Sequence, residues 1–148
     1  MSDFETINTF LVDIWGCINK IEERSLATGL DESISITEIH IIDKIGDCPP
    51  RRMSEVARLL GVTLATLTVA CDKLESKDLV MRTRDTRDKR VVNISLTARG
   101  RAVYEYHQQF HRRMIEAALE NFTPEETAVL ASSLLKLQRF FLSQDASE

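Results

Sequence analysis

Residues 53–77 constrain the fold more than any other part of the chain, because they hold two short helical segments separated by a glycine. Ser54 can cap a helix over residues 55–60, and Gly61 suits the left-handed position after it. Thr63 can cap a second helix running to about Lys77. The pattern predicts a helix–turn–helix.

The next residues change from helical to strand periodicity. Residues 79–84 and 91–96 are short β-type segments, and in the second one Val92, Ile94 and Leu96 alternate with polar residues. The turn between them is rich in arginine and aspartate. A hairpin that follows a helix–turn–helix at this distance predicts a winged helix–turn–helix.

The flanking sequence is helical in pattern. Apolar residues recur at steps of three and four over residues 4–26, which predicts one amphipathic helix ending near Gly29. Ser35 and Glu38 have capping-box spacing at the start of a helix that stops at Gly46, and residues 47–50 form a loop by composition. Two further helices are expected at 98–121 and 124–142, capped by Thr97 and Thr123.

The charge of the chain is unevenly distributed. The 148 residues carry a formal net charge of -4, which by itself argues against a nucleic-acid partner. Residues 1–50 carry -7, residues 51–101 carry +6 and residues 102–148 carry -3. The basic part therefore coincides with the predicted helix–turn–helix and wing. A solvated basic face is the plainer alternative.

Several classes of protein are disfavoured. No stretch approaches the roughly 18 apolar residues of a membrane span, and no signal peptide is apparent, so we expect a cytoplasmic protein without membrane contact. The sequence also has no glycine-rich phosphate loop and no nucleophile elbow, and Gln108 stands where a metalloprotease would need glutamate. We expect that the chain is not an enzyme.

The three cysteines lack CxxC pairing, which argues against a disulfide framework. Cys17 and Cys71 fall on apolar helix faces, where buried, inert thiols are expected. Cys48, in the loop before Pro49, is the one candidate redox thiol.

The predicted second helix can lie in the major groove of DNA while the hairpin reaches the backbone or the minor groove. Its outward face is small and mostly uncharged, which favours modest direct readout helped by DNA shape. Asp85 and Asp88 are expected to fold the wing turn and orient its arginines. The expected DNA-contacting residues are Thr63, Ala65, Thr66, Thr68, Val69 and Lys73 on the helix and Arg84, Arg87, Lys89 and Arg90 on the wing.

Three motifs carry a resemblance to a known family. These are the run Met53–Ala57, the D-x-R-D-x-R turn at 85–90 and the junction from Leu96 to Gly100. Together they resemble the MarR family of bacterial regulators, over essentially the whole chain. One departure is Asp78, where the family often has glycine, although aspartate tolerates the left-handed region better than most residues.

The resemblance implies a mainly α fold with a small β-hairpin wing. Residues 1–148 would form a single MarR-like chain in which a winged helix–turn–helix, residues 33–97, is inserted in a helical dimerisation layer, residues 1–30 and 98–148. It also implies a homodimer that places two winged domains on adjacent major grooves of a double-stranded operator.

Within the family, the sequence is most similar to the repressors of fatty-acid biosynthesis of Gram-positive bacteria. The matching stretches are residues 34–40, 62–64 and 107–111. This likeness implies a repressor whose DNA binding is strengthened by long-chain acyl groups on acyl carrier protein. The effector pocket it suggests, between the DNA-reading part and the dimer layer, involves Trp15, His40, His107, Phe110 and His111. A MarR-type regulator with another small lipophilic effector is an alternative.

The three histidines permit a second hypothesis. His107 and His111 are four residues apart, a helical spacing that can hold one metal ion, and no other cofactor is expected. With Glu22 and His40 they resemble a zinc site of the family's zinc-uptake regulators, although the rest of those regulators' metal ligands has no match. The histidines can equally be hydrogen-bonded interface residues or line the effector pocket.

Overall fold

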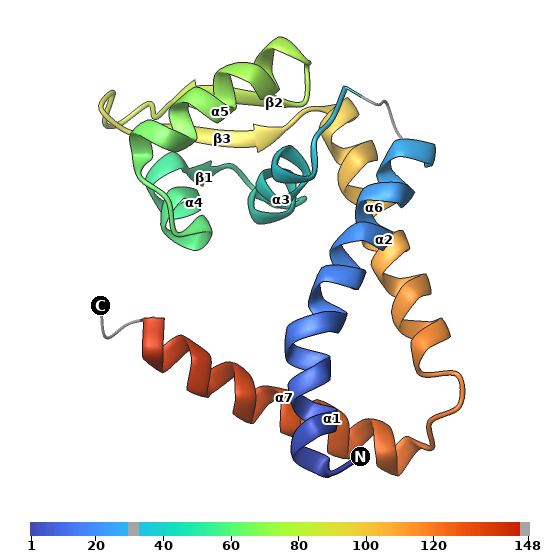
Figure 1. The fold of residues 1–148 in the computed structure, drawn as a ribbon. Helices are drawn as coiled ribbons and strands as arrows, with labels where there is room; N and C mark the ends of the chain where they lie inside the picture. The colour runs from blue at the N-terminus through green and yellow to red at the C-terminus, as the bar shows by residue number, and fades with distance from the viewer. Residues whose placement is uncertain (30–32, 146–148) are drawn as a thin grey trace. The chain divides into compact units, whose positions relative to one another are not determined.

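Helices form most of the chain in the computed structural model, which describes residues 1–29 and 33–145 (Figure 1). Residues 1–110 and 111–148 form two compact units. Among the described residues no single helix is long and apolar enough to cross a membrane; only the bent pair of helices Met53–Leu60 and Leu64–Ser76 passes, on length and composition alone. The elements are α1 Asp3–Thr9, η1 Phe10–Ile14, α2 Trp15–Gly29, α3 Ile36–Ile45, β1 Arg51–Arg52, α4 Met53–Leu60, α5 Leu64–Ser76, β2 Val80–Arg84, β3 Val92–Leu96, α6 Ala98–Ala118 and α7 Pro124–Asp145.

The predicted N-terminal helix is interrupted. Ser2 and Glu5 form a capping box at the start of α1, and the five residues of η1 then form a π-helix before α2. A π-helix is wider than an α-helix and turns the side chains that follow it out of α-helical register. The periodicity predicted helix here but not this interruption.

Helix α3 begins and ends where its sequence predicts. The Ser35 hydroxyl accepts a hydrogen bond from the Glu38 amide, while the Glu38 carboxylate accepts one from the Ser35 amide. Four isoleucines of α3 are buried in the hydrophobic core of the first unit, and the helix stops at Gly46. Buried apolar area of this kind supplies most of the stability of a small helix.

Helix α4 starts earlier than expected. Its N-cap is Arg52, not Ser54, and the Arg52 side chain makes no capping bond. Gly61 ends the helix with φ 66°, ψ 30°, in the left-handed region that the turn requires. Thr63 then caps α5, and its hydroxyl accepts from the Thr66 amide at 3.1 Å.

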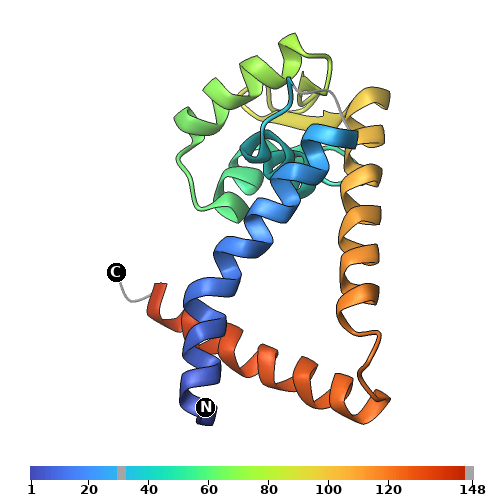
Figure 2. The same ribbon diagram turned by 45° about the vertical axis from the view of Figure 1, so that its right-hand side comes forward.

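The wing belongs to a three-stranded antiparallel sheet of order β1–β3–β2. Strands β2 and β3 pair Arg82 with Ile94 and Arg84 with Val92, as expected for a hairpin. Strand β1 was not predicted, because two arginines alone carry no alternating pattern. Figures 1 and 2 show α5 alongside the hairpin in both views, and α5 contacts β2 directly.

The core of the first unit gathers side chains from α3, α4, α5, the sheet and the start of α6. Cys71 is buried in it, and burial raises the pKa of its thiol to about 11. The prediction for Cys17 was wrong, because its side chain is exposed on α2. The loop cysteine, Cys48, is also exposed; its thiol contacts the Arg51 guanidinium, Sγ to Nε 3.1 Å.

Helix α6 begins against the backbone that precedes the wing. A Cβ atom at Gly100 would lie 1.9 Å from the carbonyl oxygen of Leu79, so no side chain fits there. The Thr97 hydroxyl donates to the Asp78 carbonyl at 2.6 Å and accepts from the Gly100 amide at 3.0 Å. Asp78 itself has φ 57°, a left-handed conformation that aspartate tolerates, as the sequence indicated.

The second unit contains the end of α6 and all of α7. Helix α6 ends at Ala118, three residues before the predicted Asn121. Thr123 and Glu126 form a reciprocal cap at the start of α7, which runs three residues past the predicted end at 142. None of the 22 residues of α7 is buried within the chain.

Candidate nucleic-acid interface

The outward face of α5 is formed by small side chains. Thr63, Ala65, Thr66, Thr68, Val69 and Lys73 are all exposed, while Leu67, Cys71 and Leu74 of the opposite face are buried. The Thr68 hydroxyl donates to the Leu64 carbonyl at 2.8 Å, and the Thr63 and Thr66 hydroxyls lie 2.9 Å apart. A surface this free of bulk allows the helix backbone to approach a groove closely.

Two aspartates hold the turn of the wing. Asp85 Oδ1 accepts from the amides of Arg87 at 2.7 Å and Asp88 at 3.1 Å, and these amides keep the pKa of Asp85 below its ordinary value. Asp88 binds the guanidinium of Arg90 at 3.1 and 3.2 Å and accepts from its amide at 3.0 Å. The carboxylates are therefore occupied in shaping the turn.

The cationic side chains of the wing differ in their partners. Arg84, Arg87, Lys89 and Arg90 are all exposed. In the described part of the chain, only Arg90 of these four has a carboxylate within ion-pair distance. The other three can turn to an external anion without first breaking an ion pair.

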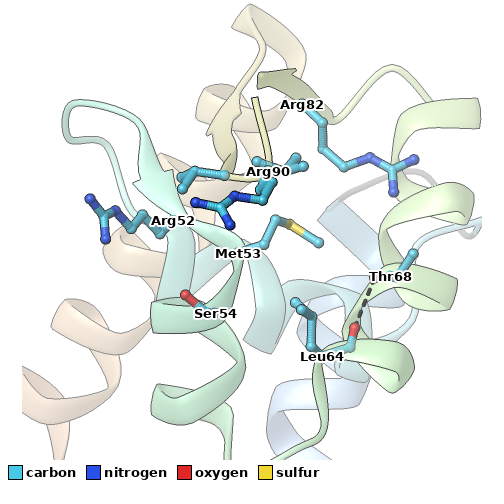
Figure 3. A pocket seen from close by; sticks show the side chains of 9 residues that line it. Arg52, Met53, Ser54, Leu64, Thr68, Arg82 and Arg90 are labelled. Atoms are coloured by element: carbon cyan, nitrogen blue, oxygen red, sulfur yellow. Dashed lines mark hydrogen bonds between the residues drawn. The ribbon is translucent and has the colours of Figure 1, made fainter. Parts of the chain in front are cut away.

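A pocket of about 250 Å³ lies between the start of α5 and the base of the wing (Figure 3). Three arginines, two hydroxyls and four apolar side chains line it: Arg52, Arg82, Arg90, Ser54, Thr68, Met53, Leu64, Val91 and Val92. Arg52, Ser54 and Arg82 were not among the residues predicted for this surface. Sequence periodicity could have found Arg82, because it shares a strand face with Arg84.

Arg82 connects the hairpin to α5. Its Nη2 atom lies 2.6 Å from Asp72 Oδ1 and 2.6 Å from Glu75 Oε2, and its amide donates to Glu75 Oε1 at 3.1 Å. Glu75 and then Asp72 raise the pKa of Arg82, and Arg82 in turn lowers the pKa of Glu75. Asp72 and Glu75 of α5 together hold the guanidinium in this bridge.

The end of α5 is anchored at its other side. Lys77 Nζ lies 2.8 Å from both carboxylate oxygens of Glu38 and also contacts the Ser33 carbonyl. Arg99 donates to the Lys77 carbonyl at 2.7 Å. The orientation of α5 is thus fixed by α3, by the hairpin and by the start of α6.

The predicted histidine cluster is partly assembled within the first unit. His107 is 1% exposed; its Nε2 contacts Glu22 Oε1, and its Nδ1 lies 2.6 Å from Asp43 Oδ2. His40 Nε2 lies 3.7 Å from the same Glu22 oxygen. Burial lowers the pKa of His107, but Asp43 and Glu22 outweigh it and the pKa is raised. Asp43 is a partner that the sequence did not suggest.

The remaining residues predicted for an effector or metal site are His111, Phe110 and Trp15. His111 is one turn beyond His107 on α6 and falls in the second unit, while Phe110 is half-buried. Trp15, at the start of α2, is 68% exposed. Their roles stay predictions.

Comparisons with known proteins identify the family. Residues 34–92 match the MarR family profile. The repressor YetL of Bacillus subtilis is 33% identical over 127 residues, 84% of this chain and 74% of YetL; MdtR, another repressor of that organism, is 26% identical over 118 residues, 80% of this chain and 76% of MdtR. Streptococcus pneumoniae FabT in complex with DNA is 37% identical with a TM-score of 0.89, covering 96% of this chain and 99% of FabT.

These likenesses agree with the geometry of α5 and the wing. The mainly helical fold with a small β-sheet wing is confirmed, as is the expectation that the chain is not an enzyme. The chain belongs to the MarR family of DNA-binding transcriptional regulators.

Proposed function

We propose that this regulator is a homodimeric repressor of fatty-acid biosynthesis genes, modulated by a long-chain acyl effector carried on acyl carrier protein. The observation that carries the proposal is the end-to-end likeness to FabT in complex with DNA, at 37% identity. YetL and MdtR are transcriptional repressors, which supports repression by this chain. The fatty-acid role rests on the resemblance of residues 34–40, 62–64 and 107–111 to the repressors of that pathway.

The described surface suits an operator duplex. Helix α5 would enter the major groove with its threonines near base edges, while Arg84, Arg87, Lys89 and Arg90 of the wing would reach phosphates or the minor groove. The absence of arginine, asparagine and glutamine from the groove-facing residues 63–73 favours a contribution from DNA shape to sequence preference.

A second copy of this chain is proposed to cover the exposed apolar faces. A helix of 22 residues without a buried side chain is not stable by propensity alone. Large apolar surfaces of this kind mark protein interfaces. The exposed apolar residues include Phe4, Ile7, Phe10, Leu11 and Ile14 in the first unit and Val129, Leu130, Leu134, Leu137, Phe140, Phe141 and Leu142 in the second.

A DNA-binding titration tests the proposal. The probe is a fluorescent duplex from the region upstream of the protein's own gene, and its binding is measured by fluorescence anisotropy. The titration is repeated with acyl carrier protein that bears a long-chain acyl group and, as the matched control, with unacylated carrier protein. We expect the acylated carrier alone to raise the affinity. Binding that neither carrier changes would contradict the acyl effector; a response to a free lipophilic molecule would favour another small effector.

We propose zinc-dependent regulation as a second candidate function, and one specific observation favours it. Glu22 lies against both His107 and His40, and the second ring nitrogen of His107 faces Asp43. A metal-binding histidine almost always gives its other ring nitrogen to a carboxylate or carbonyl, which fixes the ring. Glu22, His40, His107 and His111 would be the ligands, because imidazole and carboxylate groups suit zinc chemically.

Calorimetric titration of the metal-free protein with zinc separates the two candidates. We expect the unaltered protein to bind zinc and His107→Ala to lose that binding, with a zinc-dependent shift in DNA affinity lost in parallel. Asp43→Asn should weaken zinc binding about 10- to 100-fold, as outer-shell changes typically do. Absence of zinc binding would leave the three imidazoles as structural or effector-contacting groups.

A further inference from the structure

Arg82 lines the pocket, and two carboxylates on α5 match its charge. In Figure 3 its side chain extends from β2 toward α5, where one guanidinium nitrogen bridges Asp72 and Glu75. The side chain of Arg82 is 21% exposed, against 91% for Arg90. Of the two carboxylate partners, Asp72 is the more exposed, with 62% of its side chain open to solvent against 36% for Glu75.

The bridge joins the two elements that must reach DNA together. Glu75 also accepts the Arg82 amide, so the same carboxylate holds both the backbone and the side chain of β2. Three residues after Arg82, just past the end of β2, Asp85 folds the turn that carries Arg87. These bonds hold the tip of the wing at a defined position relative to α5, because charge-assisted hydrogen bonds are short and directional.

A second consequence is electrostatic. Without Arg82, Asp72 and Glu75 would present two unmatched carboxylates on the element that approaches phosphates, and like charges repel. Because the Arg82 guanidinium is bound to both carboxylates, it cannot bind a phosphate without leaving Asp72 and Glu75 unpaired.

We infer that Arg82 is a positioning residue of the DNA interface: it fixes the wing relative to α5 through Asp72 and Glu75 and does not itself contact the phosphate backbone. The inference rests on the placement of α5 and the wing against DNA. Its consequence is that sequence discrimination, which needs both elements in register, depends on a side chain that touches no nucleotide.

The test compares Arg82→Gln with Arg84→Gln, a matched control on the same strand face without a carboxylate partner among the described residues. The probes are a duplex selected from a random pool by the unaltered protein and a scrambled duplex of equal length. Affinity is measured over a range of salt concentrations. The folded fraction of each variant is measured by circular dichroism. If the unaltered protein selects no duplex, the proposed function fails before this test begins.

For Arg82→Gln the uncovered carboxylates should weaken binding to both duplexes alike, and we expect affinity for the selected duplex to fall about tenfold further, the loss typical of one misplaced base contact. The slope of log affinity against log salt on the scrambled duplex should stay unchanged. For Arg84→Gln both affinities should fall together and the slope should shrink by about 0.9, one phosphate's worth. If Arg82→Gln behaves like Arg84→Gln, Arg82 is a phosphate contact and the inference is overturned.

Asp72→Asn keeps the inference testable if Arg82→Gln does not fold. Removing a negative charge near DNA should, by field alone, tighten binding to both duplexes equally. Loss of the bridge instead predicts a lower ratio of selected to scrambled affinity. An unchanged ratio overturns the inference.

Discussion

Lys77 and Glu38 are 39 residues apart in sequence, yet Lys77 Nζ lies 2.8 Å from both oxygens of the Glu38 carboxylate. Glu38 is 8% exposed and also closes the capping box of α3. One carboxylate therefore holds the start of α3 and the end of α5 together. Burial alone raises the pKa of Glu38, but the bonds from Lys77 and Ser35 outweigh it and the pKa is lowered.

This ion pair predicts acid sensitivity. Because the pKa of Glu38 is lower in the folded state, its contribution to stability is complete above the unfolded pKa of 4.5 and is lost as pH falls through the folded value. Glu38→Gln should lower the free energy of unfolding at neutral pH by about 1–3 kcal/mol and flatten its fall in acid. Urea denaturation at several pH values measures this. Glu55→Gln, in an exposed pair with Arg51, is the control; equal acid profiles for the unaltered protein and Glu38→Gln would contradict the account.

Arg87→Ala tests the wing. Arg87 is exposed and its amide is held by Asp85, so the side chain is presented outward. We expect weaker binding to every DNA sequence and a salt slope smaller by about 0.9, because one phosphate contact is lost. Arg87→Lys should keep the slope. An unchanged slope in Arg87→Ala would remove this residue from the contacts.

Thr66→Ala tests base reading by α5. We expect the sequence preference to change while the salt slope stays constant, because a hydroxyl near a base edge carries no charge. Selection from a random pool before and after the change measures the preference. Lys73→Ala is the comparison, with uniform weakening expected. Uniform weakening by Thr66→Ala would count against a base contact.

Gly100→Ala tests the junction between α6 and the hairpin. Since the new Cβ would meet the Leu79 carbonyl at 1.9 Å, backbone must move, and we expect a loss of about 1–3 kcal/mol or more in unfolding free energy. Gly16→Ala is the control, because nothing lies within 4 Å of a Cβ there and alanine in a helix should stabilise by about 0.5–1 kcal/mol. Similar melting curves for both variants would show that the close contact is absent in solution.

Leu134→Glu tests the proposed dimer. Leu134 is 46% exposed on α7, and a charge there should oppose burial against a second copy. We expect the mass measured by sedimentation to fall from two chains to one. Gln138→Glu, an exposed polar position one turn further along α7, should leave the mass unchanged. A monomeric unaltered protein, or a dimeric Leu134→Glu, would contradict this interface.

Local chemistry made much of the fold predictable. Ser35 with Glu38, Gly61 and Thr63 are signals read within four residues, and each acts in the structure as the sequence indicates. Strand β1 and the Arg52 cap escaped prediction because pairing with β3, rather than any local pattern, defines them. The exposure of Cys17 was not predicted, because an apolar helix face indicates burial in general. The pattern does not say whether the covering surface belongs to this chain or to another one.

The site was predictable in outline and less so in its connections. The exposed faces of α5 and the wing follow from periods of 3.6 and 2, which fix direction without knowledge of the rest of the fold. The pairings of Arg82 with Glu75, Lys77 with Glu38 and His107 with Asp43 join separate elements. Such contacts depend on how elements pack, and composition carries no record of them.

The π-helix η1 changes the rotation of α1 about the helix axis relative to α2. Each residue added to or removed from a helix rotates everything before it by about 100° about the axis. Deletion of one residue within Phe10–Ile14 would therefore rotate Phe4, the aromatic residue of α1, to a different side of the helix axis without altering it. A deletion of one residue can therefore change which side chains of α1 face a partner chain, and so which partner is accepted, while the amino-acid composition stays nearly constant.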